Sequence, residues 1–413
     1  IFDMILMVII LQNINLDDLD ISLLKNFKDY VKTEVDDPRQ PWKTEYKLWD
    51  ILVTSIVAIL CNNDEVIDMY DFIVSKKDFF KQFLKLTNGI ASSWTYERVL
   101  SLIDPDTLQD CLNYFNETVI FQYNSKKDII SLDGKTDNGS ARNTLEKIKP
   151  LNVLSAYSDN QSACLYSIMI EDKTNEIPTV PEILDKLKLK DVIVTWDALN
   201  TQTNNIKAVI ERGGDYVVPI KANQGNFYND LALYFKEDVL DEIRIGKLKT
   251  TYKKVIEKAN SKVITYEYFQ TEDVKWYFDI KSWKKLNTFG LVQKTIDNGN
   301  EITIEKRYYI SSLFNDIELF SRAIRTHWNI ENKLHWHLDF TFKQDDNTTM
   351  NKRLLFNIQL IKKFCLTLLE KVKQEYKISF RRIRHKLELN PEIEVPKLFM
   401  LLANKTTKIY HKK

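Results

Sequence analysis

Hydrophobic positions recur at helical spacing through the first part of the chain, from about residue 15 to residue 120. Turn signals at Asp37-Pro38, Asn62-Asn63 and Asn88-Gly89 separate these apolar runs. No residues in an evident catalytic pattern interrupt them. The pattern therefore predicts an all-helical N-terminal domain over residues 1–122, with a role in packing, in assembly or in contacting a partner.

From residue 123 the pattern changes to short β-prone runs that alternate with helices. One run, Ile129–Leu132, ends at Asp133 and breaks into a turn with glycine, and another, 191–197, ends at Asp197. The remaining predicted strands are 151–158, 162–170 and 215–221, the first two as antiparallel neighbours, and the predicted helices are 178–190 and 204–212. This alternation predicts an α/β unit over residues 123–239.

Residues 240–312 shift further towards β-structure, in short runs rich in Tyr and Ile that include VKWYFDI. We interpret them as an inserted β-rich subdomain. Asn315 or Asp316 can then cap the start of a helix. Neither Gly nor Pro interrupts the residues that follow, so one continuous helix is predicted. This helix and a second one at 352–373 form a segment 313–376, which a basic helical tail, 377–413, follows.

Composition and charge agree with a division of the chain into several parts. With 413 residues, 44% of them hydrophobic, the chain can bury a large core and form two or three domains. Its net charge of +1 conceals an asymmetry: residues 351–413 hold 16 Lys/Arg and 5 Asp/Glu, a net +11, which leaves −10 for residues 1–350. A basic tail favours a polyanionic partner and an acidic body favours cations, although a solvated basic helix explains the tail equally well.

The cysteines and the chain start bear on the compartment. Four widely spaced cysteines without CxxC spacing disfavour a disulfide framework and a structural zinc site, and favour a reducing compartment. The apolar start Met4–Leu11 is too short to span a bilayer. A start with Ile rather than Met is typical of a truncated or processed chain. We expect a cytoplasmic protein without a membrane partner.

A cluster of unusual residues lies within the predicted helix that follows the β-rich segment. Three of the five histidines and two of the eight tryptophans surround Glu331, within eleven residues: His327, Trp328, His335, Trp336 and His337. A carboxylate on a half-apolar helix face is costly unless a cation or a metal ion pairs with it. A zinc site is disfavoured, because the histidine spacing does not match a common ligand set and no thiolate is near. Packing or phosphate contact is favoured for the histidines, and core positions are favoured for Trp328 and Trp336.

Glu331 has two candidate partners upstream. Asp133 and Asp197 each end a β-run, and carboxylates at the ends of parallel strands can converge on one site. Three carboxylates supply the hard oxygen ligands that Mg²⁺ or Mn²⁺ prefers, and two such ions about 4 Å apart can promote phosphoryl transfer. The alternative from spacing alone is that both aspartates only cap turns.

The sequence of several segments resembles a known family. The segments are LDGKT, KTNEIPTVPEIL, VTWDALNTQ, ERGGDYVVPIKANQGNFYND, RYYISSL and IRTHWNIENKLHWHLDFTF. In this order they closely resemble the DDE-type insertion-sequence transposases of the H-repeat-associated family. The helical LWDILVTSIVAIL and SSWTYERVLSLIDPDTLQDCL also resemble that family's leader domain. The resemblance covers roughly residues 40 to 400.

This resemblance implies an α/β fold with an RNase H-like catalytic core, interrupted by a β-rich insertion before the last acidic residue. Asp133 in DGK, Asp197 in TWDA and Glu331 in NIEN match the family's metal ligands, so two Mg²⁺ or Mn²⁺ ions are implied as the cofactors. The implied activity is cleavage of DNA strands at element ends and joining of the 3′-hydroxyl to target DNA. A homodimer on double-stranded DNA, no small-molecule cofactor, and a nucleoid-associated place in a bacterial cytoplasm are implied as well.

With DNA as the implied partner, polar and basic residues near the motifs become candidate DNA contacts. They are Lys135, Lys221, Asn223, Arg325, His327, Asn332, Lys333, Arg381, Arg382 and Arg384. Each could instead be a solvated surface residue.

The chain departs from the family pattern at several positions. Ile324, His327 and Leu338 stand where related transposases carry the Tyr, Arg and Lys of a signature around the glutamate. Asn138 replaces a basic residue, Gln344 replaces a Glu, and residues 197–202 lack the usual Gly. Reduced activity, a catalytically silent DNA-binding descendant and a stand-alone nuclease therefore stay open as alternatives.

Overall fold

The computed structural model describes residues 28–33, 35–120, 127–141, 149–170, 176–248, 250–259 and 262–410, with the side chains of 118–120 and 404–410 left aside. Two compact units divide the chain. The helical unit comprises Ile1–Tyr123, Asp137–Leu151 and Trp336–Lys413, and the sheet unit comprises Asn124–Thr136 and Asn152–His335. This division differs from the five predicted segments, since it assigns the residues after His335 to the unit of the N-terminal helices. The predicted boundary at 122/123 and the apolar start Met4–Leu11 lie outside the described residues.

The helical unit is built on two buried helices. Its elements are η2 (Pro41–Lys43), α3 (Leu48–Leu60), α4 (Val66–Ser75), α5 (Lys77–Lys81), α6 (Ser93–Leu102), α7 (Pro105–Ile120), η3 (Asn138–Ser140), η8 (His337–Thr341), η9 (Gln344–Asp346), α13 (Lys352–Tyr376), α14 (Phe380–Leu389) and α15 (Pro391–Tyr410). Helix α3 is apolar on all sides and α13 is buried over most of its length, which is typical of helices that neighbours surround. Helix α13 packs against α3, α6 and α7. Among the described residues before β1, the chain forms the helices α3 to α7 and the short 3₁₀-helix η2.

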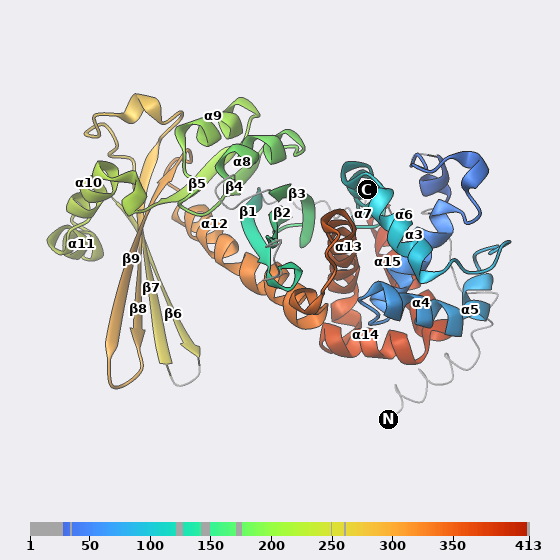
Figure 1. Cartoon of the computed structure of the whole chain (residues 1–413). Helices are drawn as coiled ribbons and strands as arrows, with labels where there is room; N and C mark the ends of the chain where they lie inside the picture. The colour runs from blue at the N-terminus through green and yellow to red at the C-terminus, as the bar shows by residue number, and fades with distance from the viewer. Residues whose placement is uncertain are drawn as a thin grey trace. The chain divides into compact units, whose positions relative to one another are not determined.

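The sheet unit contains one nine-stranded sheet (Figure 1). Its strands are β1 (Asp128–Asp137), β2 (Leu151–Ser158), β3 (Ala163–Ile170), β4 (Val192–Thr195), β5 (Asp215–Ile220), β6 (Thr251–Ala259), β7 (Lys262–Thr271), β8 (Thr288–Asp297) and β9 (Ile302–Ser311). The strand order is β3-β2-β1-β4-β5-β9-β8-β7-β6. Strand β4 is parallel to both β1 and β5, whereas β2 and β3 are antiparallel as predicted.

The structure corrects three sequence predictions for the sheet. The β-rich segment does not fold as a separate subdomain, because β9 pairs antiparallel with β5 and so continues the same sheet. Within that segment VKWYFDI forms no strand; it contains turns and leads into the 3₁₀-helix η6 (Ile280–Ser282). In addition, β1 does not end at Asp133 but continues to Asp137. Asp133 therefore lies within a strand rather than in a turn.

Helices cover both faces of the sheet. Helices α8 (Glu176–Asp185), α9 (Thr203–Glu211), α10 (Asn226–Tyr234) and α11 (Glu237–Arg244) contribute to one apolar cluster, and α12 (Ile317–Ile330) contributes to another. Phe320 of α12 packs on Gly290 of β8, where an added Cβ would lie 2.2 Å from the ring. A glycine at 290 thus permits the close approach of α12 to the sheet.

Helix α12 begins as predicted and ends differently. Asp316 caps its start, because its Oδ1 accepts a hydrogen bond from the Leu319 amide at 2.9 Å. From Glu331 the chain continues as π-helical turns, η7 (Glu331–His335) and η8, rather than as the uniform helix that the sequence predicted. The Phe342 amide donates to the His337 carbonyl at 3.1 Å, five residues back. Such wide turns are rare in proteins, and those that occur are often found at functional sites.

Among the described residues no helix combines the length and apolar character that crossing a bilayer requires.

Candidate active site

Asp133 lies on β1, and Asp197 follows the adjacent parallel strand β4, two residues beyond its end at Thr195. The register pairs Ser131 of β1 with Thr195 of β4, so each aspartate stands two residues beyond the same paired position. This equal offset brings both aspartates to the same end of the paired strands, where the charge of Asp197 helps to raise the pKa of Asp133. The two aspartates therefore lie near each other, and their joint role as metal ligands stays a prediction.

Glu331 and His335 reach the same place from the first π-helical turn after α12. Nδ1 of His335 lies 3.5 Å from Oδ2 of Asp133 and 3.5 Å from Oε2 of Glu331. Ligand atoms of Asp133, Glu331 and His335 all lie within 4.8 Å of one another, and we call this group the carboxylate cluster. Its side chains are exposed to different degrees: 7% for His335, 20% for Asp133 and 70% for Glu331.

The two carboxylates of the carboxylate cluster have pKa values that are shifted in opposite directions. Burial raises the pKa of Asp133 to about 6; nearby His335 opposes this shift, and the carboxylates of Glu331 and Asp197 add to it. The pKa of Glu331 is lowered, chiefly by its hydrogen bond with His335. At neutral pH three carboxylates therefore lie close together with one imidazole between two of them. Such a group can hold a cation.

Asp197 lies beside the cluster rather than within its closest group. Its Oδ1 accepts hydrogen bonds from the amide and the side-chain Nδ2 of Asn200, each at 3.2 Å. The same Nδ2 lies 3.0 Å from Oε1 of Glu176. Asn200 thus fixes the orientation of Asp197 and links it to a further carboxylate.

Glu176 is a residue of this site that sequence reasoning missed. A Cβ built on Gly134 would lie 2.8 Å from Oε1 of Glu176, so the carboxylate lies directly over the residue after Asp133. Glu176 begins α8 and belongs to the quoted segment KTNEIPTVPEIL. That segment was the available signal, although its spacing from the other carboxylates gave no reason to select it.

His335 was the second residue that the sequence did not single out as part of the site. It was predicted to serve in packing or phosphate contact. Its side chain is buried, and Nε2 has no hydrogen-bond partner among the described residues. The separation of four residues between Glu331 and His335 on a helix was the signal that could have identified it.

Some predicted DNA contacts lie near the cluster. Lys135 follows Asp133 on β1, and its charge helps to lower the pKa of Glu331. Lys333 donates to Oδ1 of Asp159 at 2.7 Å, while Asn332 is exposed beside Glu331. Their role as DNA contacts stays a prediction.

His327 and two residues after β5 lie beside these groups. Burial and the nearby Arg307 charge lower the pKa of His327 to about 4, so its ring is neutral at pH 7 and offers no positive charge to a phosphate. The exposed Lys221 is close enough to add to this lowering. Asn223 donates from Nδ2 to the Ala198 carbonyl at 3.1 Å, which ties the turn after β5 to the segment that carries Asp197.

Other predicted residues are engaged elsewhere. Arg325 forms an ion pair with Glu257 of β6 at 2.5 Å and lies over the Tyr266 ring, so the β-rich segment holds it. The prediction that Arg384 contacts DNA was wrong, because its side chain is 0% exposed and pairs with Asp64 at 2.6 Å. Trp328 packs beside Tyr266 as predicted, whereas Trp336 is 48% exposed and its prediction as a core residue was wrong.

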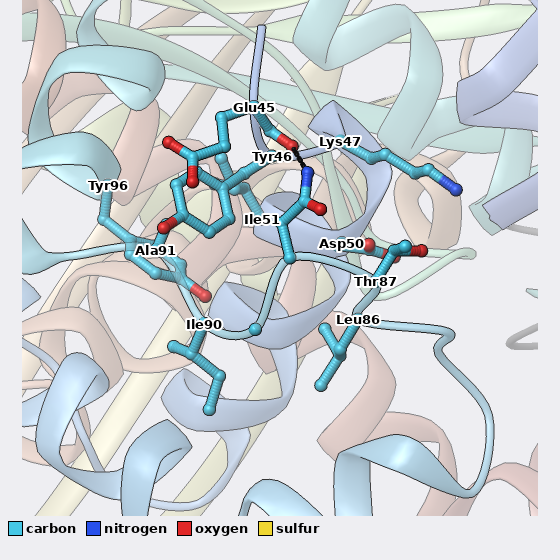
Figure 2. A pocket seen from close by; sticks show the side chains of 12 residues that line it. Glu45, Tyr46, Lys47, Asp50, Ile51, Leu86, Thr87, Ile90, Ala91 and Tyr96 are labelled. Carbon is cyan, nitrogen blue, oxygen red and sulfur yellow. Dashed lines mark hydrogen bonds between the residues drawn. The ribbon is translucent and has the colours of Figure 1, made fainter.

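A small pocket of the helical unit offers no comparable chemistry (Figure 2). It lies where Glu45, Tyr46 and Asp50 face the loop Leu86–Ala91, and the Asn88 side chain bonds to the Glu45 carbonyl across it. Its volume of about 20 Å³ leaves room for one water molecule. A substrate does not fit there.

The donor set at the carboxylate cluster fits a divalent cation. Within the cluster Asp133 and Glu331 offer carboxylate oxygens, and Asp197 offers another beside it. Carboxylates suit Mg²⁺ and Mn²⁺, and imidazole suits transition-metal ions.

The comparisons with known proteins agree with this chemistry. Residues 124–369 match the family model described as Transposase DDE domain, and residues 32–115 match the model described as DDE_Tnp_1-associated. The "H repeat-associated putative transposase YhhI" of Escherichia coli (strain K12) is 32% identical over 330 residues, 78% of this chain and 84% of that protein. The "Putative transposase YncI" of Escherichia coli O157:H7 is 30% identical over 376 residues, 89% of this chain and 93% of that protein.

A solved structure of piggyBac transposase in a synaptic complex with hairpin DNA also matches, over 95% of this chain and 83% of that one. Its TM-score of 0.37 and its identity of 11% are too low to support an argument on the fold. The sequence matches alone carry the assignment. They span the sheet unit and much of the helical unit, and they include all five residues of the site: Asp133, Glu176, Asp197, Glu331 and His335. The chain belongs to the DDE transposases, in the family of the H-repeat-associated transposases.

Proposed function

We propose that the protein is a DNA transposase that cleaves strands at the ends of its element and joins the freed 3′-hydroxyl to target DNA. The observation that supports this most directly is the common register of Asp133 and Asp197, with Glu331 brought to Asp133 through His335. We also propose that the core of the sheet unit is RNase H-like. The parallel strands β1, β4 and β5 and the membership of the DDE family support this assignment.

Asp133, Asp197 and Glu331 would hold one or two Mg²⁺ or Mn²⁺ ions. When bound, such ions activate the attacking oxygen and stabilise the leaving oxygen in phosphoryl transfer. The protein itself supplies position and charge. Asn200 fixes Asp197, the strand register fixes Asp133, and the exposed Glu331 presents its carboxylate towards solvent, where a substrate can approach.

Basic side chains near the cluster would position the DNA backbone. Lys135, Lys221 and Lys333 bring positive charge to the edge where the carboxylates gather, and Asn332 offers an exposed amide. Contacts to phosphate orient a duplex without reading its sequence. We therefore assign these residues to holding the scissile phosphate near the carboxylates.

A groove of the helical unit supports a second DNA contact. It is lined by nine residues, among them Phe340, Lys343, Arg381, Arg382 and His385. Phe340 is exposed and stacks on Trp336 with ring centroids 4.6 Å apart. Exposed aromatic rings beside basic side chains suit a nucleic-acid strand, because bases stack on rings while phosphates contact the cations.

The test is strand cleavage of DNA that carries the element ends, taken from the sequence flanking the gene. Wild-type protein should cut with Mg²⁺ and fail without it, and Asp133→Ala should not cut. Asp238→Asn, at an exposed residue of α11 paired with Lys236, is the control and should cut like the wild type. Equal cleavage by wild type and Asp133→Ala, or cleavage without a divalent ion, contradicts the mechanism.

The same assay separates two other functions. A catalytically silent DNA-binding protein is favoured by the departures from the family pattern, such as the missing Gly in residues 197–202. A relative named "Inactive transposase YbfQ" is 40% identical over 65 residues, 16% of this chain and 77% of that protein. A silent protein would bind the end DNA without cutting it, and a nuclease would cut without joining ends. A transposase should also assemble as a homodimer on end DNA, which light scattering with and without DNA measures. We place this activity at the nucleoid of a bacterial cytoplasm.

A further inference from the structure

His335 belongs to the carboxylate cluster without any role in the activity described so far. It lies four residues beyond Glu331, in the same π-helical turn. We propose that Nδ1 of His335 is a direct ligand of the divalent ion, so that the site binds its metal through an imidazole nitrogen as well as carboxylate oxygens. This proposal rests on the proposed metal-dependent function.

The position of Nδ1 supports a ligand role. It lies at the same distance, 3.5 Å, from Oδ2 of Asp133 and from Oε2 of Glu331. Two ligand atoms that each lie about 2.1 Å from a common ion are separated by about 3 to 4.2 Å, depending on the angle between them. The two nitrogen–oxygen separations fall within that span without any movement of the side chains.

The rest of the ring supports the same role. His335 is 5% exposed, and Nε2 is buried without a hydrogen-bond partner among the residues that the structure describes. If the neutral ring carries its proton on Nε2, the lone pair of Nδ1 faces two carboxylates, which is unfavourable unless a cation lies between them. If the proton is on Nδ1, it can be shared with the carboxylates but the buried Nε2 stays unsatisfied. Nε2 has no partner in either arrangement, but a cation between the three atoms removes the repulsion between the Nδ1 lone pair and the two carboxylates in the first one.

A nitrogen ligand has a consequence for metal choice. Carboxylates suit Mg²⁺ and Mn²⁺, whereas imidazole favours transition-metal ions over Mg²⁺. With His335 as a ligand the protein should therefore bind Mn²⁺ more tightly than Mg²⁺. Replacement of His335 by Gln should reduce that preference, because the amide offers an oxygen in place of the imidazole nitrogen.

The experiment uses the full-length protein with Mn²⁺ and no DNA. Pulsed electron paramagnetic resonance should show a ¹⁴N coupling of a directly bound histidine in the wild type. The coupling should be lost in His335→Gln, and its Mn²⁺ affinity should fall about tenfold or more, a loss at least as large as that expected for an outer-shell partner. The matched control is His385→Gln, an identical change at an exposed histidine of the groove; because the assay contains no DNA, this variant should keep both the coupling and the affinity.

The outcomes separate this inference from the proposed function. If wild-type protein binds Mn²⁺, Asp133→Asn abolishes that binding and no ¹⁴N coupling appears, then His335 is not a ligand although the carboxylate site stands. If wild-type protein binds no Mn²⁺ at all, the proposed function fails and this inference falls with it. Circular dichroism checks the folding of His335→Gln; should that variant not fold, the wild-type spectrum decides alone.

Discussion

Two groups of charged residues in this protein differ in how completely their charges are satisfied. In the carboxylate cluster, Asp133 and Glu331 share one imidazole, and burial together with neighbouring carboxylates raises the pKa of Asp133 to about 6. In the helical unit, Arg384 pairs with Asp64 and donates to the carbonyls of Ile59 and Thr341. We call this second group the Arg384 cluster.

This difference in charge balance indicates the role of each cluster. The guanidinium of Arg384 also lies over the Phe342 ring at 4.2 Å, so its charge and its donors are matched inside the protein, and no position stays open for a ligand. The carboxylate cluster has an excess of negative charge and an exposed Glu331. A buried and matched charge holds a fold together, while an unmatched one at an accessible edge binds a cation.

The largest effect is expected from removing a carboxylate of the cluster or that of Asp197 beside it. Asp133→Asn, Asp197→Asn or Glu331→Gln should each lower strand cleavage by roughly 10³-fold or more, because metal ions contribute several kcal/mol to such reactions. For Asp133→Asn the midpoint of thermal unfolding should equal or exceed that of the wild type. The reason is that the buried, ionised carboxylate of Asp133 destabilises the metal-free folded protein, and the substitution removes it. A variant that unfolds at lower temperature and keeps its activity would reverse the assignment of this cluster.

Breaking the Arg384 cluster should cost stability instead. Arg384→Met leaves Asp64 buried without its partner, and the free energy of unfolding should fall by about 3 to 5 kcal/mol. Urea unfolding followed by circular dichroism measures this change. Arg381→Met, one turn away on α14 and exposed, is the control and should unfold near the wild-type midpoint. Equal stability of the two variants would contradict the buried role of Arg384.

The pH dependence of metal binding should report on Asp133. A divalent ion binds the deprotonated carboxylate, so Mn²⁺ affinity should be constant above about pH 7 and fall up to about tenfold per pH unit below the pKa of about 6. The folding stability of the metal-free protein should change with pH in the opposite direction to the Mn²⁺ affinity. Because the folded state raises this pKa, the metal-free protein gains protons relative to the unfolded chain between about pH 4 and 6, and its stability falls as pH rises through that window. Calorimetric titration from pH 5 to 8 measures the affinity, and Asp133→Asn should remove both trends.

The smallest effects are expected at exposed arginines of the groove. Arg381→Ala and Arg382→Ala should each weaken binding to duplex DNA several-fold and reduce the slope of log affinity against log salt by about 1. Fluorescence anisotropy at several salt concentrations gives both quantities. Lys285→Ala, a basic residue of the sheet unit that pairs with Asp215, is a control in which the salt slope should stay unchanged. An unchanged slope for all three variants would exclude the groove as a phosphate contact.

Much of the fold followed from periodicity, and the failures have physical causes. Strands β2, β3 and β5 and the capped start of α12 follow the sequence prediction within a residue or two. The place of the β-rich segment could not be predicted, because pairing between β5 and β9 joins residues about 90 apart. Helical spacing likewise gave no sign of the π-helical turns after Ile330, since they keep the same residue types as an α-helix.

The candidate site was predictable in part. Asp133, Asp197 and Glu331 were identified from strand ends and from the family resemblance, but His335 and Glu176 became visible only through distances in space. Arg384 shows the converse error. Its neighbours Arg381 and Arg382 share its charge and are exposed, and only the packing of α14 decides that Arg384 is buried.

The pairing of β9 with β5 also makes the two ends of strand β9 differ in the changes they can tolerate. Ser311 and Tyr308 are held by Val217 and Ile220, just before the helix that carries Glu331. At the other end, the exposed loop Asn298–Glu301 joins β8 to β9 through bonds within the turn itself. Residues can be added at that loop, in evolution or by an engineer who wants to fuse a DNA-targeting module, without shifting the glutamate.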